Sequence, residues 1–254
     1  MNSYRKQSRR GGKKNDPVVT TVLNFTKPTA SEPSLLSLEE VSTLFHEFGH
    51  ALHGLLSDCT YYEISGTSVP RDFVELPSQI MENWATHPEV MKMYAKHYKT
   101  GEVIPQELID KIEKSGLFNQ GFIQTEYLAA SLLDMNYHTL KESKEVDVPA
   151  FEAEVLDRIG LIPEIISRYR TTYFRHIFAS GYSAGYYSYI WAEVLDADAF
   201  EAFKENGLFD KETASALRAH ILSKGGSEDP MVLYKRFRGS EPSIDPLLKR
   251  KGFK

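Results

Sequence analysis

The stretch Ser37-Leu-Glu-Glu-Val-Ser-Thr-Leu-Phe-His-Glu-Phe-Gly-His-Ala-Leu-His-Gly-Leu-Leu56 predicts the element around which the rest of the chain is organised. Ser37 followed by Glu40 is the pattern of a helix-capping box, and apolar residues then recur at helical spacing. We therefore predict a helix over residues 38 to 56. Its apolar stripe, which we expect to be buried, consists of Leu38, Val41, Leu44, Phe45, Phe48 and Leu52.

Five residues of this helix, His46-Glu47-Phe48-Gly49-His50, point to a particular chemistry. Imidazoles four positions apart project from one helical face and can bind a single zinc ion together. Glu47, beside the first imidazole, can then act as a base on water at the metal. Two ordinary core histidines would have the same spacing, so the assignment depends on the rest of the sequence.

Catalytic zinc usually has three protein ligands and one open position. His53 would have to share the ion with His46, but residues seven positions apart on a straight helix are separated by about 10.5 Å along the axis. Leu56 stands where the metzincin signature requires its third histidine, which excludes that class. We therefore expect His53 to be structural or to support a ligand.

A second segment, Arg-Asp-Phe-Val-Glu-Leu-Pro-Ser-Gln-Ile-Met-Glu-Asn-Trp at residues 71 to 84, offers a carboxylate. Asp72 can cap a helix here, and Pro77 falls in its first turns, so we predict a helix over residues 72 to 85. Glu75 would complete a His, His, Glu ligand set. It could equally be a surface carboxylate in the favourable field of the helix N-terminus. The residues alone leave both readings open.

A third segment, from His176 to Trp191, is rich in tyrosine and contains glycines at 181 and 185 that loosen the backbone where a helix would start. The tyrosines with near-helical spacing are Tyr182, Tyr186 and Tyr189. A phenol directed at a carbonyl oxygen can stabilise the negative charge that develops there during peptide hydrolysis. The alternative is an aromatic helix in the core, which we expect for Tyr187 and Trp191.

The first two segments resemble the zinc-binding core of the thimet oligopeptidase family, which includes oligopeptidase A and bacterial dipeptidyl carboxypeptidases. Residues 24 to 28, Asn-Phe-Thr-Lys-Pro, and the tail that begins at Tyr234 also resemble this family. The resemblance implies one zinc ion, with Glu75 as the third ligand beside His46 and His50. It assigns catalysis to Glu47, Tyr189, Tyr186 and His176, and substrate binding to Tyr182 and Gly181. The loop here reads Ala-Ser-Gly where a run of glycines is common, so we expect it to be somewhat less flexible.

What the resemblance implies is a zinc metallopeptidase that hydrolyses short peptides without a covalent intermediate. The details of the third segment favour release of C-terminal dipeptides. The alternatives are an endo-acting oligopeptidase and a zinc-binding fragment with little activity of its own. The roles of Glu82 and Gln79 remain open: either could orient a ligating imidazole or simply be solvated. The arginines considered for the substrate carboxylate are Arg175, Arg236 and Arg238.

We expect a mainly α fold of the zincin type with a small β-sheet. Residues 18 to 25 should form a strand, whose edge could pair with an extended peptide. Further helices are expected over residues 117 to 141, 149 to 159, 163 to 175, 183 to 205, 210 to 223 and 230 to 236. By resemblance, residues 1 to 254 correspond to the C-terminal catalytic portion of a longer architecture. Its N-terminal helical part is absent here and would be a partner.

Composition adds little specificity. A formal net charge of −5 gives no overall case for nucleic acid, although basic residues gather in the first fourteen positions, where we expect a solvated loop. The single cysteine, Cys59, cannot form an intramolecular disulfide, which suits the reducing cytoplasm. We find no signal peptide and no apolar run of membrane-spanning length, and we expect no membrane association.

Overall fold

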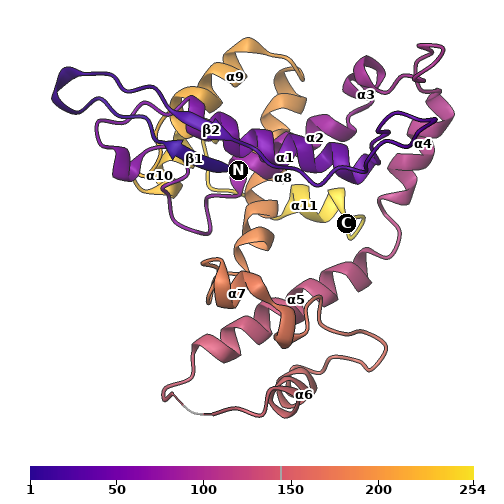
Figure 1. Cartoon of the computed structure of the whole chain (residues 1–254), viewed down its shortest axis with the longest axis vertical. Helices are drawn as coiled ribbons and strands as arrows, with labels where there is room; N and C mark the ends of the chain where they lie inside the picture. The colour runs from indigo at the N-terminus through magenta and orange to yellow at the C-terminus, as the bar shows by residue number, and fades with distance from the viewer. Residues whose placement is uncertain (144) are drawn as a thin grey trace. The chain divides into compact units, whose positions relative to one another are not determined.

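The computed structural model describes residues 1–143 and 145–254, and this part of the chain is mainly helical with one small sheet (Figure 1). The expected fold class is therefore confirmed. The chain divides into two compact units. Unit 1 comprises residues 1–113 and 192–254, and unit 2 comprises residues 114–191. No helix of the described residues is long and apolar enough to cross a membrane.

Most elements belong to unit 1. They are β1 (Asn2–Arg5), β2 (Val18–Thr20), α1 (Leu38–Leu55), α2 (Leu76–Thr86), α3 (Pro88–Tyr94), α4 (Gln106–Ser115), α8 (Ser188–Asn206), α9 (Lys211–Leu217), the π-helical turn η4 (Arg218–Leu222), α10 (Pro230–Arg238) and α11 (Asp245–Arg250). Short 3-10 turns are η1 (Arg10–Gly12) and η2 (Tyr62–Ile64). Unit 2 contains α5 (Gln120–His138), α6 (Val148–Arg158), η3 (Thr171–Tyr173) and α7 (Arg175–Ala179). The end of α4 and the start of α8 also lie in unit 2.

The sheet is an antiparallel pair, β1 with β2, in which Asn2 faces Thr20 and Ser3 faces Val19. The register then shifts, so that Arg5 faces Val18. The expected strand over residues 18 to 25 is therefore too long, since β2 ends at Thr20. A strand persists only where a neighbour supplies hydrogen bonds, and the four residues of β1 pair only with Val18–Thr20.

Helix α1 begins as predicted: the Ser37 side chain accepts from the Glu40 amide, and the Glu40 carboxylate accepts from the Ser37 amide. Its buried face is not the expected one. Leu44 and Phe48 are 37% and 50% exposed, so the prediction of a buried stripe that includes them is wrong. The buried residues are instead Gly49, Ala51, His53 and Gly54. Small side chains on this face let neighbouring backbone come close. The spacing of large apolar residues, on which the prediction was based, does not detect such a face.

A hydrophobic core of unit 1 fixes α2 against α8, α10 and the α9–η4 segment. Leu76 and Ile80 of α2 are fully or almost fully buried beside Leu195 of α8 and Leu233 of α10. Each such side chain contributes about 1.5–3 kcal/mol relative to exposure. The helix that begins next to Glu75 is therefore firmly held.

Three of the predicted helices differ clearly from the observed elements. Helix α2 begins at Leu76 rather than near residue 72, because the proline at position 77 stands at its N-terminus and Glu75 is the N-cap. Helix α8 begins at Ser188 rather than 183, because Gly181 and Ala184 have φ of 85° and 51°, which a right-handed helix cannot contain. Residues 163 to 175 are not one helix but turns that lead into η3 and α7.

In unit 2 the core is small and aromatic. Ala130 of α5 packs with Phe174, Ile177 and Tyr186, all from the segment after α6. The packing of Phe174 and Ile177 in this core overrides the local helical propensity of residues 163 to 175. Turns therefore form there instead of a regular helix. Tyr187 and Trp191 are 41% and 36% exposed, so the expectation that they are core residues is wrong.

Candidate metal centre

Three side chains of unit 1 converge on one point. The Nε2 atoms of His46 and His50 lie 3.3 Å and 3.1 Å from the same Glu75 oxygen, Oε2. Among the described residues, these three form the group whose ligand atoms all lie within 4.8 Å of one another. The Glu75 side chain is 3% exposed, so the reading of Glu75 as a surface carboxylate is wrong.

The distances suit a tetrahedral zinc ion. Bonds of about 2.0–2.1 Å at tetrahedral angles place neighbouring ligand atoms about 3.3 Å apart. The observed separations of 3.1 Å and 3.3 Å are close to that value. Two imidazoles and one carboxylate are also the ligand set of catalytic zinc in peptidases. The donors therefore fit the metal that the sequence suggested.

Glycine 49 brings the helices together. A β-carbon at this position would stand 2.2 Å from the Pro77 carbonyl oxygen and 2.6 Å from the Ser78 Cα. Only a residue without a side chain lets α1 approach the start of α2 so closely. The Ser78 hydroxyl in turn donates to Glu75 Oε2 at 2.9 Å, which orients the carboxylate towards the two imidazoles. The sequence pattern does not predict this role, although the glycine lies within the His46–His50 motif.

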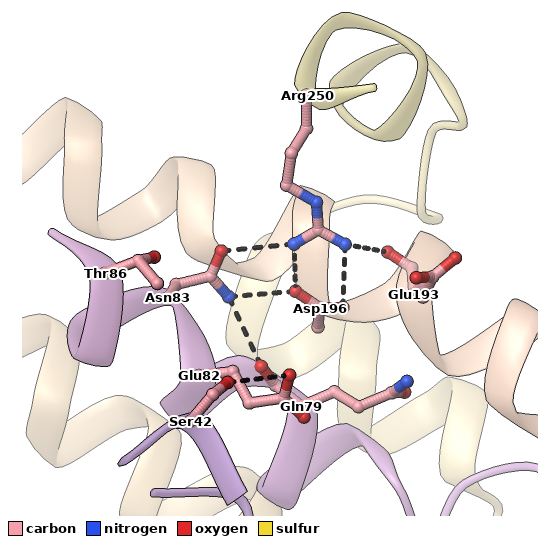
Figure 2. A pocket seen from close by; sticks show the side chains of 8 residues that line it. All are labelled: Ser42, Gln79, Glu82, Asn83, Thr86, Glu193, Asp196 and Arg250. Carbon is pink, nitrogen blue, oxygen red and sulfur yellow. Dashed lines mark hydrogen bonds and ion pairs between the residues drawn. The ribbon is translucent and has the colours of Figure 1, made fainter. Parts of the chain in front are cut away.

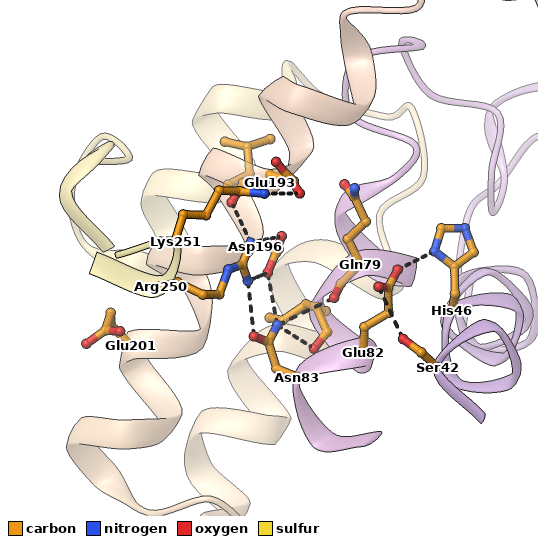
Figure 3. A network of polar contacts seen from close by, with 12 residues as sticks. Ser42, His46, Gln79, Glu82, Asn83, Glu193, Asp196, Glu201, Arg250 and Lys251 are labelled. Carbon is orange, nitrogen blue, oxygen red and sulfur yellow. Dashed lines mark hydrogen bonds and ion pairs between the residues drawn. The ribbon is translucent and has the colours of Figure 1, made fainter. Parts of the chain in front are cut away.

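Glu82, one of the two residues left open above, contacts the other side of His46. Its Oε1 lies 2.6 Å from His46 Nδ1, and the Ser42 hydroxyl donates to its second oxygen at 3.4 Å (Figure 3). Such a carboxylate fixes the ring orientation and the tautomer of a ligating imidazole. The structure thus gives Glu82 the contact that a supporting residue needs.

Electrostatics favour the charged forms of His46 and Glu75. Burial disfavours a charged His46, but hydrogen bonds to Glu75 and Glu82 outweigh that effect and raise its pKa to about 10. Burial likewise opposes a charged Glu75, yet hydrogen bonds from His46 and His50 hold the pKa of this carboxyl far below its usual range. A proton on an imidazole here takes the place that a cation would occupy. Metal binding therefore competes with protons at this point.

Behind Glu82 lies a polar cavity of about 240 Å³, shown in Figure 2. Across it the Arg250 guanidinium contacts both oxygens of Asp196, with one hydrogen bond of 3.1 Å to Oδ2, and reaches Asn83 Oδ1 at 3.1 Å. Asn83 donates to Asp196 Oδ1 at 2.9 Å. These contacts connect α11 and α8 to α2 at Asn83, the residue after Glu82, as Figure 3 also shows. No local sequence signal links residues so far apart.

The remaining groups on α1 differ in their surroundings. Glu47 is partly exposed, and its carboxylate accepts from the Met1 amino group. His53 is fully buried, and among the described residues neither of its nitrogens finds a hydrogen-bond partner. Burial, with a smaller contribution from the charge of His50, lowers the pKa of His53 to about 3. His53 is therefore a neutral core side chain and does not belong to the ligand group.

A second cluster lies in unit 2. The rings of Tyr182 and Tyr189 stack with centroids 5.1 Å apart, and His176 packs 6.1 Å and 6.3 Å from them. Tyr186 is 2% exposed and stacks on Tyr127 at 5.0 Å. Burial raises the pKa of Tyr186 to about 12, so its hydroxyl stays protonated, as a hydrogen-bond donor must be.

The structure thus forms two clusters, one in each unit, from the residues that the sequence selected. Unit 1 groups His46, His50 and Glu75, and Glu47 follows His46 on α1. Unit 2 groups His176 with its tyrosines, and Gly181 lies in the exposed turn between α7 and α8 with φ of 85°.

One helix supplies a His-Glu-Phe-Gly-His motif, and the start of the next supplies a glutamate to the same point. This helical fold defines a class of protein in which two histidines and a glutamate converge. Comparison with known proteins gives the family within that class. Residues 1–253 match Peptidase family M3, and the chain belongs to this family.

Alignments with several peptidases extend over nearly the whole chain. A dipeptidyl carboxypeptidase of Escherichia coli (strain K12) is 48% identical over 241 residues, or 94% of this chain and 35% of that protein. An oligopeptidase A of the same organism is 43% identical over 240 residues, with the same two shares. A probable cytosolic oligopeptidase A of Arabidopsis thaliana is 40% identical over 242 residues. The chain spans about a third of the length of these relatives.

Proposed function

We propose that this chain is the zinc-dependent catalytic part of a peptidase that hydrolyses short peptides. The observation that carries the proposal is the convergence of His46 Nε2, His50 Nε2 and Glu75 Oε2 at distances that suit one tetrahedral zinc ion. Membership of Peptidase family M3 supports it. We also propose the cytoplasm as the compartment, because the chain has a single cysteine.

Each residue has a defined part in this proposal. His46, His50 and Glu75 hold the ion, and Glu82 keeps the His46 ring in position through the 2.6 Å contact at Nδ1. Zinc bound there would supply Lewis-acid polarisation of water and of the scissile carbonyl. Glu47 takes a proton from the attacking water and later gives a proton to the leaving amine. The water oxygen adds to the carbonyl carbon, and the carbon–nitrogen bond then breaks as the leaving amine takes the proton, without a covalent enzyme intermediate.

The unit 2 cluster would act on the substrate. Tyr189 and Tyr186 donate hydrogen bonds to the oxygen on which charge develops, and His176 assists them. Tyr182 and the turn at Gly181 contact the peptide. Support comes from the packing of these side chains around His176.

Release of C-terminal dipeptides is the cleavage pattern that we propose. The dipeptidyl carboxypeptidase match at 48% identity supports it, and the oligopeptidase A match at 43% makes internal cleavage the second candidate. The third candidate is a zinc-binding fragment that needs a separate N-terminal half as partner for turnover. It is considered because the chain spans about a third of the length of its relatives.

Mass spectrometry of peptide products tests the proposal. The zinc-loaded chain is incubated with a hexapeptide that has a free C-terminus and with its amidated twin. We expect stepwise loss of dipeptides from the free acid. Glu47→Gln should lower the rate at least about 100-fold and keep the zinc. Glu39→Gln, an exposed glutamate on the same helix, is the matched control and should keep the rate.

Two other results would favour the alternative functions. Internal cuts in both peptides would support the oligopeptidase alternative. An absence of cleavage in a protein that binds one equivalent of zinc would contradict activity of the chain by itself.

A further inference from the structure

Arg168, in the turn before η3, is an exposed arginine without an acidic partner among the described residues. Its guanidinium lies over two aromatic rings, 5.4 Å from the centroid of Tyr127 and 5.9 Å from that of Tyr169. Burial opposes its charge, but the nearby phenols of Tyr186, Tyr169 and Tyr127 outweigh that effect and raise the pKa of the guanidinium. Neutral rings and hydroxyls hold the charge in place, and they leave it free to attract an anion.

Five other arginines differ from Arg168 in their contacts. In unit 2, Arg170 pairs with Glu152 and Arg158 with Glu154. Two of the arginines considered from the sequence are also neutralised: Arg236 pairs with Glu228, and Arg238 with Glu205. Arg175, the third, begins α7, and within the part of the chain that the structure describes no aromatic ring lies under its guanidinium.

The rings that hold Arg168 continue into the tyrosine cluster. Tyr169 packs 5.2 Å from His176 and 5.9 Å from Tyr186, and Tyr186 packs 5.6 Å from Tyr189. The guanidinium and the His176 ring therefore contact the same tyrosine. A continuous set of packed aromatic side chains within unit 2 connects the cation to the side chains that we propose to contact the reacting carbonyl.

We propose that Arg168 binds the C-terminal carboxylate of the peptide substrate and so selects free-acid peptides cut two residues from their end. This inference rests on the proposed function. Two residues of extended peptide span about 7 Å, a distance compatible with two groups that lie against one tyrosine ring. A planar guanidinium held by rings presents paired donors to a carboxylate, which an ammonium group does not.

Binding measured without turnover tests the inference. The zinc-loaded Glu47→Gln protein is titrated with the N-terminally labelled hexapeptide and with its amidated twin, and fluorescence anisotropy gives both dissociation constants. We expect the free acid to bind about tenfold or more tightly than the amide, the effect of one charge-assisted contact. Adding Arg168→Gln should reduce this ratio to near one, and Arg168→Lys should leave part of it. Arg175→Gln, on the neighbouring helix, should keep the ratio.

An unchanged ratio in Arg168→Gln would overturn the inference. So would a ratio lost in Arg175→Gln instead, or an absence of preference in the protein with Arg168 intact. Absence of binding by either peptide would overturn it as well. Circular dichroism of each variant shows whether unit 2 is still folded, and Arg168→Lys provides a second variant if the glutamine form is not.

Steady-state kinetics of the same Arg168 variant distinguish a failure of this inference from a failure of the proposed function. In the protein with Glu47 intact, Arg168→Gln should raise KM for free-acid peptides about tenfold and change kcat little, because the residue does not touch the reacting atoms. Cleavage without any dependence on Arg168 would leave the peptidase proposal standing and refute the role of Arg168. Free-acid binding that depends on Arg168, without cleavage, would do the reverse.

Discussion

Gly49 lies where the two helices that carry the proposed ligands are closest, with the Pro77 oxygen 2.2 Å from the place of a β-carbon. We predict that Gly49→Ala pushes α1 from α2, separates Glu75 from the imidazoles, and lowers zinc affinity at least about tenfold, with a loss of about 1–3 kcal/mol in stability. Isothermal titration with zinc and urea unfolding measure both.

The matched control is Gly121→Ala on α5, where a β-carbon would meet nothing within 4 Å. Relief of backbone entropy should stabilise this variant by about 0.5–1 kcal/mol and leave zinc affinity unchanged. Unaltered zinc binding in Gly49→Ala would show that the helices adjust without loss of the site.

His53 makes the stability of the metal-free protein depend on acid. Its folded pKa of about 3 lies below the value of about 6.5 for an unfolded histidine. The unfolded state therefore binds more protons between these values, and the stability that neutral His53 preserves is lost as the pH falls from about 6.5 towards 3. The contribution to the slope approaches 1.4 kcal/mol per pH unit.

Both His53→Leu and His53→Gln should flatten this slope, because neither side chain titrates. Urea unfolding at pH 6, 5 and 4, with a chelator present, gives the free energy of unfolding. Slopes equal to that of the unmodified protein would rule out His53 as the source of the acid sensitivity.

At the scale of elements, α2 is held on two sides. Its apolar face lies in the core of unit 1, and its polar face meets α8 and α11 through Asn83, Asp196 and Arg250. Asp196 is 2% exposed at its side chain, so its charge depends on the arginine. Breaking a buried pair typically costs about 3–5 kcal/mol, because one charge loses its partner.

We predict that Arg250→Met destabilises the protein by about 3 kcal/mol, and that adding Asp196→Asn recovers part of the loss in a double-mutant cycle. Thermal or urea unfolding measures both variants. Lys254→Ala, which breaks an exposed pair with Asp245, is the control and should cost under about 1 kcal/mol. Additive effects of the two buried changes would mean that the residues act separately.

At the scale of the whole molecule, the proposed ligands all belong to unit 1, on α1 and next to α2. Zinc at 100 times its dissociation constant should stabilise the folded state by about 2.7 kcal/mol. We predict that hydrogen exchange slows on zinc addition in α1 and α2, with little change in α5 and α6. Mass spectrometry of exchanged peptides measures this, with His50→Ala as the control that loses the effect. Equal protection of both units would show that they unfold together.

Local patterns were sufficient for α1 and for the pairing of its two histidines. The capping box and the apolar spacing place α1 to within a residue at its C-terminus, because both act within one or two turns of helix. The four-residue histidine spacing puts two imidazoles on one face for the same reason. The choice of Glu75 needed the family resemblance, since a carboxylate at a helix start has two readings.

Only the folded chain decides which distant groups meet. The closeness of α1 and α2 at Gly49, the bond from Glu82 to His46, and the union of Asn83, Asp196 and Arg250 join segments far apart in the sequence. The exposed Leu44 and Phe48, and the start of α8 after the turn at Ala184, are decided by packing and backbone geometry rather than by periodicity. Pattern-based reasoning describes neighbours along a helix, whereas tertiary contacts depend on the shape of every element that packs between them.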